Sequence, residues 1–204
     1  MTSPRDQILA KVRAALAPLP ERAALPDWTA ELAIARQVIA GRDRIELFTE
    51  RLKLVNGRTV SDPASLVRDL AAGGWKHGYC DPALWPQLAP HFGPEFTVET
   101  TFDRARVDDY AFGITRAAGA IAETGTIILG DRTPSRRLAA LAPWVHVAVV
   151  RKADIQETLA DATAALPDDP NLIFVTGPSK TADVEGILIE GVHGPGVQYA
   201  LLVD

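Results

Sequence analysis

Residues 145–175 read VHVAVVRKADIQETLADATAALPDDPNLIFV, and this stretch decides the fold class. The apolar run Val145–Val150 predicts a strand. Asp154 with Glu157 predicts a capping box at the start of the following helix, and Asn171–Val175 predicts the next strand. Two apolar strands joined by one amphipathic helix indicate a right-handed parallel crossover.

The chain from Thr59 onward alternates short strands with short helices. The predicted class is therefore α/β, with a mostly parallel sheet flanked by helices. Two Asp-Pro pairs, at Asp62 and Asp81, each predict a capped helix start. The expected helices are 64–72 and 83–89, and the other expected strands are 77–80, 96–99, 112–115, 126–129 and 198–203.

The first quarter of the chain differs from the rest because its apolar spacing is helical. Ser3 as N-cap and Pro4 at the first helical position predict a helix through Leu16. A second helical region is expected from Leu32 to Leu52, with a bend near Gly41. We expect a helical arm over 1–44 and one α/β domain over 45–204. Such arms pack on their own domain or on a second subunit, so a homodimer stays open.

Composition excludes several classes of function. The net charge of −5 and the scattered basic residues argue against nucleic acid as a partner. The single cysteine, Cys80, rules out an internal disulfide and any site built from several thiolates, and it fits a reducing compartment. The four histidines are scattered, so we expect no metal. No apolar run approaches the roughly 20 residues that span a bilayer, and no signal peptide is visible, so the expected location is cytoplasmic.

Two stretches rich in glycine and hydroxyl side chains, 113–130 and 177–196, hold nine of the 15 glycines. Each stretch adjoins a run of buried-type apolar residues. Glycine permits close backbone approaches, and open α/β sheets bind ligands at strand ends. The two stretches therefore predict the functional site, provided that they meet at one rim of a single sheet.

The second stretch does not have the spacing of a phosphate-binding loop. We expect the backbone N–H groups and side chains of Ser179 and Thr181 to hold an anion at a helix N-terminus, next to Gly177. The alternative is that Ser179 or Thr181 only caps the helix. Asp183 is a further ligand-binding candidate; it and Glu185 would face different directions on a helix.

Glu123 is the carboxylate most suited to catalysis, because its neighbours are small and apolar and it precedes Thr124, Gly125 and Thr126. Partial burial would raise its pKa and make it an acid, base or nucleophile. The alternative is a turn glutamate that binds backbone N–H groups. The three residues after it are predicted to bind ligand.

His193 lies on a tight loop between Gly191 and Gly194. A histidine held there could transfer protons near neutral pH, so it is the second catalytic candidate. The alternative is a structural hydrogen bond. His77 and His146 are expected to be structural.

Three blocks resemble the lactate utilization protein C family, whose members carry the LUD domain. They are GAIAETGT at 119–126, GPSKTADVE at 177–185 and GVHGPG at 191–196. The likeness covers about three-quarters of the chain, from the Ile45 region to Asp204.

The resemblance implies a fold like that of the group of ribose-5-phosphate isomerase, glucosamine-6-phosphate deaminase and CoA-transferase. It also implies a part in oxidising L-lactate to pyruvate, with iron–sulfur clusters in partner subunits. With one cysteine this chain carries no such cluster itself. Whether the chain is catalytic stays open.

Two alternatives stand beside that function. The first is a stand-alone enzyme, CoA-transferase-like or acting on a sugar phosphate or folate-type substrate, with Glu123 as nucleophile and the turn at Ser179–Thr181 as anion clamp. The second is a scaffold in which the glycine blocks only form turns.

Overall fold

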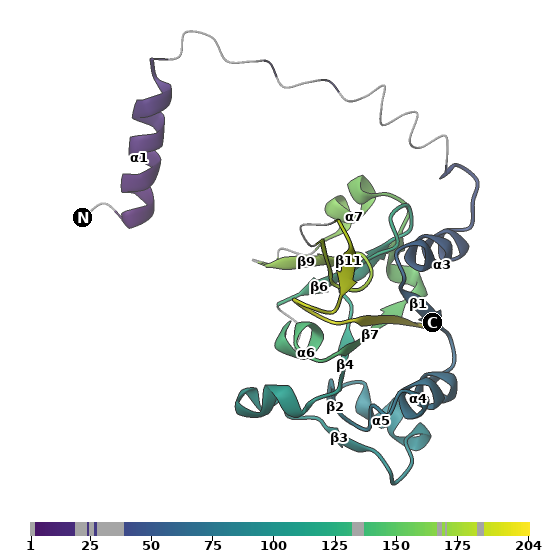
Figure 1. Cartoon of the computed structure of the whole chain (residues 1–204). Coiled ribbons are helices and arrows are strands. Elements are labelled where there is room, and N and C mark those ends of the chain that lie inside the picture. Colours follow the sequence, from purple (N-terminus) through teal and green to yellow (C-terminus); the bar gives the residue numbers. More distant parts are fainter. Residues whose placement is uncertain are drawn as a thin grey trace. The chain divides into compact units, whose positions relative to one another are not determined.

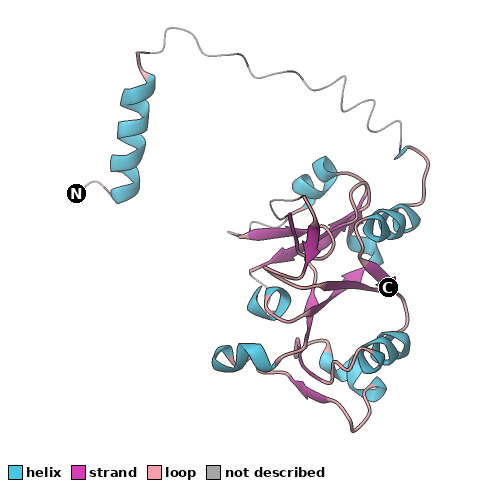
Figure 2. Ribbon diagram, in the orientation of Figure 1, coloured by secondary structure: helices cyan, strands magenta, loops and turns pink. Residues whose placement is uncertain are grey.

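The computed structural model describes residues 3–18, 24, 27, 39–131, 137–166, 169, 171–182 and 186–204. Contacts divide the chain into two compact units, Met1–Ala40 and Gly41–Asp204. Figure 1 labels the elements, and Figure 2 colours them by type.

The first unit contains helix α1 (Pro4–Leu16), as the sequence predicts. Ser3 accepts a hydrogen bond from the backbone N–H of Asp6, and the Asp6 carboxylate accepts one from the backbone of Ser3. No residue of α1 is buried. Of the second helical region predicted from Leu32 to Leu52, residues 32–38 lie outside the described residues, and residues 44–52 are helical.

The second unit begins with helix α3 (Arg44–Leu54), which Asp43 caps by accepting from the backbone of Ile45 and Glu46. Its central element is a six-stranded sheet that is parallel throughout. The strand order is β1 (Arg58–Val60), β12 (Val197–Val203), β7 (Val145–Arg151), β4 (Phe112–Arg116), β2 (His77–Cys80) and β3 (Thr97–Glu99).

Helices cover both faces of the parallel sheet, as Figures 1 and 2 show. On one face lie α4 (Pro63–Ala72), α5 (Trp85–Leu88) and the 3₁₀ turn η1 (Ala89–His91), and on the other lie η2 (Arg104–Asp109) and α6 (Arg137–Leu141). The main core lies under α4 and α5, where buried apolar side chains of β2, β4, β7 and β12 meet Leu66, Leu70 and Leu88.

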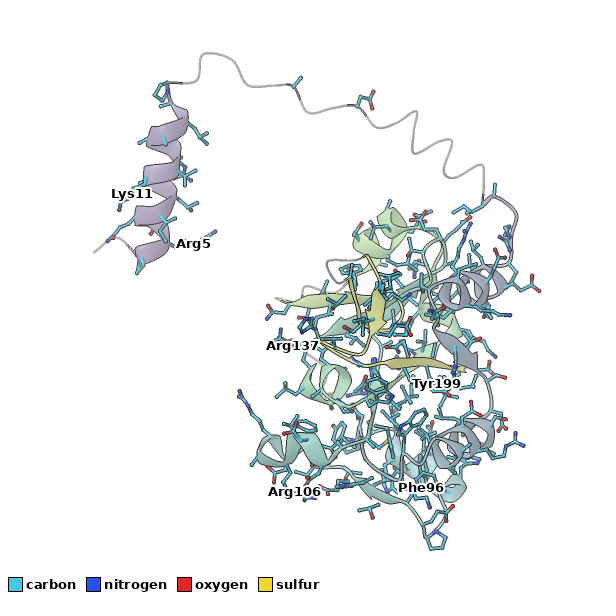
Figure 3. The ribbon with its side chains drawn as sticks, viewed as in Figure 1. Arg5, Lys11, Phe96, Arg106, Arg137 and Tyr199 are labelled. Atoms are coloured by element: carbon cyan, nitrogen blue, oxygen red, sulfur yellow. The ribbon has the colours of Figure 1, made fainter. Side chains whose placement is uncertain are left out.

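Figure 3 labels two aromatic residues of this core, Phe96 and Tyr199. Phe96 packs edge-on against Phe112 on β4. The Tyr199 hydroxyl accepts a hydrogen bond from Arg58 on β1 and donates one to Asp69 on α4. These contacts fix α4 and the edge strand β1 to the sheet.

A second, smaller sheet has four strands, and the pairs β5–β6 and β6–β9 are antiparallel. Its order is β8 (Ile155–Gln156), β5 (Gly119–Ile121), β6 (Thr126–Gly130) and β9 (Leu172–Val175). Helix α7 (Leu159–Ala165) packs on it through Ala162. The turn η3 (Lys152–Asp154) precedes β8, and a separate hairpin joins β10 (Lys180–Ala182) to β11 (Leu188–Glu190).

The predicted crossover between 145–150 and 171–175 is wrong, because β7 and β9 belong to different sheets. The parallel neighbours of β7 are β4 and β12, whereas β9 runs antiparallel to β6 at an edge. The predicted capping box is also displaced. Thr158 and Asp161 form the box, whereas Asp154 binds Arg151 and is followed by β8.

The remaining strand predictions are confirmed by β2, β3, β4, β6 and β12. The helix expected over 64–72 is α4, and the one over 83–89 is shorter and divided between α5 and η1. The α/β class with a mostly parallel sheet flanked by helices is therefore confirmed. No helix among the described residues is long and apolar enough to cross a membrane.

Cys80 provides a test of this core. Burial raises the pKa of its thiol from 9.0 to about 12, and the negative charge of Asp81 adds to the shift. Because only the thiolate reacts quickly, the folded protein should resist thiol reagents at pH 8 and label with one equivalent in guanidinium chloride. Mass spectrometry after timed alkylation measures both. Rapid labelling without denaturant would contradict the placement of Cys80.

Candidate functional site

The turn between β5 and β6 lies against the C-terminal end of helix α3. Gly125 has a positive φ of 66°, and a Cβ atom there would collide with the backbone of Arg51 and Leu52. Only glycine suits both the conformation and the close approach. The first glycine-rich stretch is thus fixed to α3 at this residue.

Glu123, beside this turn, is half-buried. Its Oε1 atom accepts a hydrogen bond of 2.6 Å from the backbone N–H of Leu159, the first residue of α7. This is the backbone contact that the turn-glutamate alternative requires. A carboxylate at a helix N-terminus also interacts favourably with the helix dipole.

Hydroxyl groups connect the two glycine-rich stretches. The Oγ1 atoms of Thr124 and Thr126 lie 2.7 Å apart, and those of Thr126 and Thr176 are separated by the same distance. Thr176 directly precedes Gly177, so the first stretch touches the second through this chain of threonines.

The second stretch also contacts the end of α3. Gly177 has a φ of 79°, and a Cβ atom there would collide with the carbonyl oxygen of Val55. The Lys180 ammonium donates to the same carbonyl oxygen over 2.8 Å. Next to it Asn56, with a φ of 67°, donates to the Glu190 carboxylate. Both stretches therefore meet at the last turn of α3.

The helix expected after Ser179 is not formed, because Lys180–Ala182 is strand β10, paired antiparallel with β11. The predicted helix N-terminus at Ser179 is therefore wrong, and anion binding by Ser179 and Thr181 stays a prediction. The backbone N–H of Ser179 donates to Pro195, and its carbonyl accepts from Gly191. Successive side chains of this segment therefore point to alternate faces of a hairpin and do not follow the spacing of a helix. Asp183 and Glu185 lie outside the described residues.

A hollow of about 280 Å³ opens between the segment 173–179, helix α6, the segment 193–195 and the first residues of β7 and β12. We call it the loop hollow. Of the predicted residues, Gly177, Ser179 and His193 line it. His193 is exposed and also borders a neighbouring hollow of about 470 Å³ beside Trp144.

The inner wall of the loop hollow includes His146 and Gln198, which are both buried. His146 Nδ1 lies 2.9 Å from Gln198 Oε1, and the Gln198 amide nitrogen donates to the carbonyl of Tyr199. Gln198 Oε1 is an acceptor, so His146 carries its proton on Nδ1. Its Nε2 then accepts from the Thr115 hydroxyl at 2.8 Å.

Burial lowers the pKa of His146 from 6.5 to about 4, against the opposing effect of the hydrogen bond to Gln198. The imidazole is therefore neutral at physiological pH. All three side chains of the network are satisfied, which agrees with the structural role expected for His146.

The predicted site residues are thus only partly brought together. Glu123, Thr124, Gly125 and Thr181 do not line the loop hollow, and Thr126 reaches its rim only through Thr176. The two glycine-rich stretches also meet at α3 and between the two sheets, and not at one rim of a single sheet.

Sequence reasoning missed Thr176 and Gln198 as lining residues. The available signal was polar residues inside apolar strands, namely Thr115, His146 and Gln198. In the part of the chain that the structure describes, no group of three or more His, Cys, Asp or Glu side chains is placed to hold a metal ion.

These features define an α/β protein in which a parallel sheet, a smaller mixed sheet and glycine-rich loops enclose a hollow with histidine and hydroxyl groups. The family model of the LUD domain matches residues 87–203, which is more than half of the chain. The protein belongs to the LUD domain family.

Several curated relatives are named lactate utilization protein C. The one from Deinococcus radiodurans is 37% identical over 102 residues, which cover 48% of each chain. The one from Geobacillus thermodenitrificans is 34% identical over 131 residues, which cover 59% of this chain and 54% of the relative. The chain spans about half the length of the curated relatives that it matches.

A crystal structure of a DUF162 family protein from Deinococcus radiodurans has the same fold. It is 25% identical, with a TM-score of 0.57, and the match covers 80% of this chain and 99% of that one.

Substituting Gly125→Ala should destabilise the protein by about 3 kcal/mol or more, since a left-handed backbone and a clash with α3 add together. Gly74→Ala is the matched control, because Gly74 has a φ of 72° and open space around it. The control should cost only about 1–2 kcal/mol. Urea unfolding measures both, and equal losses would show that Gly125 does not touch α3.

The folded pKa of His146 lies below its unfolded value, so the unfolded state binds more protons between pH 4 and 6.5. The contribution of His146 to the free energy of unfolding should be fully present above pH 6.5. It should fall by about 3 kcal/mol as the pH drops to about 4. The difference in unfolding free energy between the wild-type protein and His146→Gln, measured from pH 4 to 7, isolates this contribution. A constant difference would contradict a buried neutral imidazole.

Proposed function

We propose that the protein is a lactate utilization protein, the subunit without a cluster in a cytoplasmic iron–sulfur-dependent system that oxidises L-lactate to pyruvate. The similarity to several proteins named lactate utilization protein C carries this proposal. Because those matches span about half of each relative, the activity and the partners come to this chain only as a proposal.

The cysteine content supports the division of labour. The sequence has one cysteine, and its side chain is fully buried in the core. Iron–sulfur clusters need several thiolate ligands. Electrons from lactate would therefore pass through partner subunits, and this chain would bind the small carboxylate or organise the assembly.

The loop hollow is the proposed carboxylate site, with a role for His193 and Ser179 as hydrogen-bond donors. Thr126 shapes the rim through Thr176. The predicted catalytic role of Glu123 stays a prediction; its bond to Leu159 supports a contribution through α7, which it anchors. We further propose that the arm over 1–44 contacts a partner subunit or a second copy.

The assembly is tested by affinity purification of the protein at native expression level from cells grown on L-lactate. Iron–sulfur subunits should co-purify, and a deletion strain should grow poorly on L-lactate and normally on pyruvate. Recovery of the chain alone, with normal growth of the deletion strain on L-lactate, would rule the proposal out.

The site is tested with His193→Asn and Ser179→Ala in purified protein. Loss of a hydrogen bond to a charged ligand costs about 1.5–3 kcal/mol, so each change should weaken binding of L-lactate or pyruvate about tenfold or more. His91→Asn is the matched control, because His91 is exposed on η1 and does not line the loop hollow. Calorimetric titration measures the affinities. Equal affinity in all variants would remove the loop hollow as the carboxylate site.

A further inference from the structure

A second, larger hollow of about 520 Å³ lies at the carboxyl ends of the parallel strands, opposite to the loop hollow at their amino ends. We call it the carboxyl-end hollow. Arg116 is the last residue of β4, Arg151 is the last of β7, and Val203 is the last of β12; all three line it. Arg151 is the fifth residue after His146 along β7, so the two hollows lie about 16 Å apart along the strand.

The topology of the sheet favours this edge as a ligand site. From β2 the chain first goes outward to β3 and then returns to β4 on the other side of β2. Strand order reverses there, and ligands of open α/β sheets bind at the carboxyl ends that flank such a reversal. Asp81 follows β2 and Arg116 ends β4, so these two residues mark the reversal.

Asp81 and Arg116 form an ion pair that orients the guanidinium group. The Arg116 Nε atom lies 3.0 Å from Asp81 Oδ2, and the Asp81 side chain is fully buried. Asp81 Oδ1 accepts from the backbone N–H of Ala83, which fixes the carboxylate in turn. A third of the Arg116 side chain is accessible, 32%, and it lines the hollow. A held guanidinium suits the planar geometry of a carboxylate or phosphate group.

The other charges at this end of the strands limit the number of anionic groups on a ligand. Arg151 pairs with Asp154 at 2.6 Å, and Lys152 pairs with Asp204 at 2.5 Å. Both carboxylates line the hollow and would repel a second negative group on a ligand. The ligand should therefore carry one anionic group.

The floor of the hollow is apolar. It includes Leu84, Ala117, Val149 and Val203, and the side chains of Val149, Leu84 and Val203 continue into the main core. The size of the hollow is typical of sites for molecules much larger than lactate. An apolar body on the ligand would cover this floor and be removed from water.

We propose that the carboxyl-end hollow binds an organic anion with a single carboxylate or phosphate group on an apolar body, and that Arg116 holds the anionic group. The site is distinct from the loop hollow, so this inference does not depend on a role in lactate oxidation.

Binding is tested by calorimetric titration with ligands that share a phenyl ring. Phenyllactate tests the carboxylate source and phenyl phosphate tests the phosphate source, with benzyl alcohol as the neutral comparison and phenylsuccinate as the ligand with two carboxylate groups. At least one of the first two should bind at least tenfold more tightly than benzyl alcohol, phenylsuccinate and L-lactate. Absence of binding by both, or equal binding of the neutral alcohol, would overturn the proposal.

Variants assign the binding to Arg116. Arg116→Gln should lower the affinity for the anion at least tenfold. Arg106→Gln is the matched control, because Arg106, which Figure 3 labels on η2, pairs with Asp109 of the same turn and with Glu99 of β3. Arg106 does not line the hollow. Unchanged affinity in Arg116→Gln, or an equal loss in the control, would overturn the assignment.

A second variant keeps the test decisive if Arg116→Gln does not fold. Ala117→Leu leaves the ion pair intact but fills part of the hollow, so it should also lower the affinity for the anion at least tenfold. His193→Asn should leave binding at this site unchanged, which separates a failure here from a failure of the proposed function. Full affinity in Ala117→Leu would place the ligand elsewhere.

Discussion

Two parallel strands that follow each other in the chain need a crossover connection. It leaves the carboxyl end of the first strand and returns to the amino end of the next. The rest of this structure depends on how the chain meets that requirement around β7. Residues 117–144 connect β4 to β7, and residues 152–196 connect β7 to β12. The first connection supplies β5 and β6, and the second supplies β8 and β9. Pairing of β5 with β8 and of β6 with β9 joins the two connections into the second sheet.

Both glycine-rich stretches lie largely within these connections, which explains why they converge. A helix end leaves carbonyl groups without intrahelical partners, and the last turn of α3 is where the two connections come together. Lys180 from the second connection donates to Val55, and Gly125 from the first packs on the backbone of Leu52. The glycines are thus required in the first place by packing between loops and helix, and the loop hollow is formed beside that contact.

Local signals in the sequence predicted most strands of the parallel sheet, since they are short runs of mainly apolar residues. The N-caps Ser3 and Asp62 likewise predicted where their helices begin. The partner of β9 could not be predicted in this way. An apolar run such as Leu172–Val175 is compatible with a parallel inner strand or an antiparallel edge strand, and only the position of β6 decides between them.

The candidate site shows the same division. Gly177, Ser179 and His193 were predicted to lie close together, and they line one hollow. The helix predicted after Ser179 is wrong because no local signal in Lys180–Ala182 indicates its pairing with Leu188–Glu190. The position of Arg116 in the first glycine-rich stretch does not by itself predict a role, because the Arg116 guanidinium is oriented by Asp81, 35 residues away in sequence.

The two edges of the sheet differ in the kind of polarity that the core tolerates. At the amino end of β7, the buried polar group is an imidazole that stays neutral because protonation would place an uncompensated charge in the core. At the carboxyl end of β2, the buried group is the Asp81 carboxylate, and Arg116 compensates it while remaining partly accessible. None of the described residues that line the loop hollow is lysine or arginine, so the proposed recognition of a carboxylate there would rely on His193, hydroxyl groups and backbone donors. Of the two hollows, only the carboxyl-end hollow has arginine, whose charge is permanent, among the described residues that line it. Since an unpaired anion is costly to remove from water, the loop hollow suits a small ligand that stays partly hydrated, and the carboxyl-end hollow suits one that is more fully enclosed.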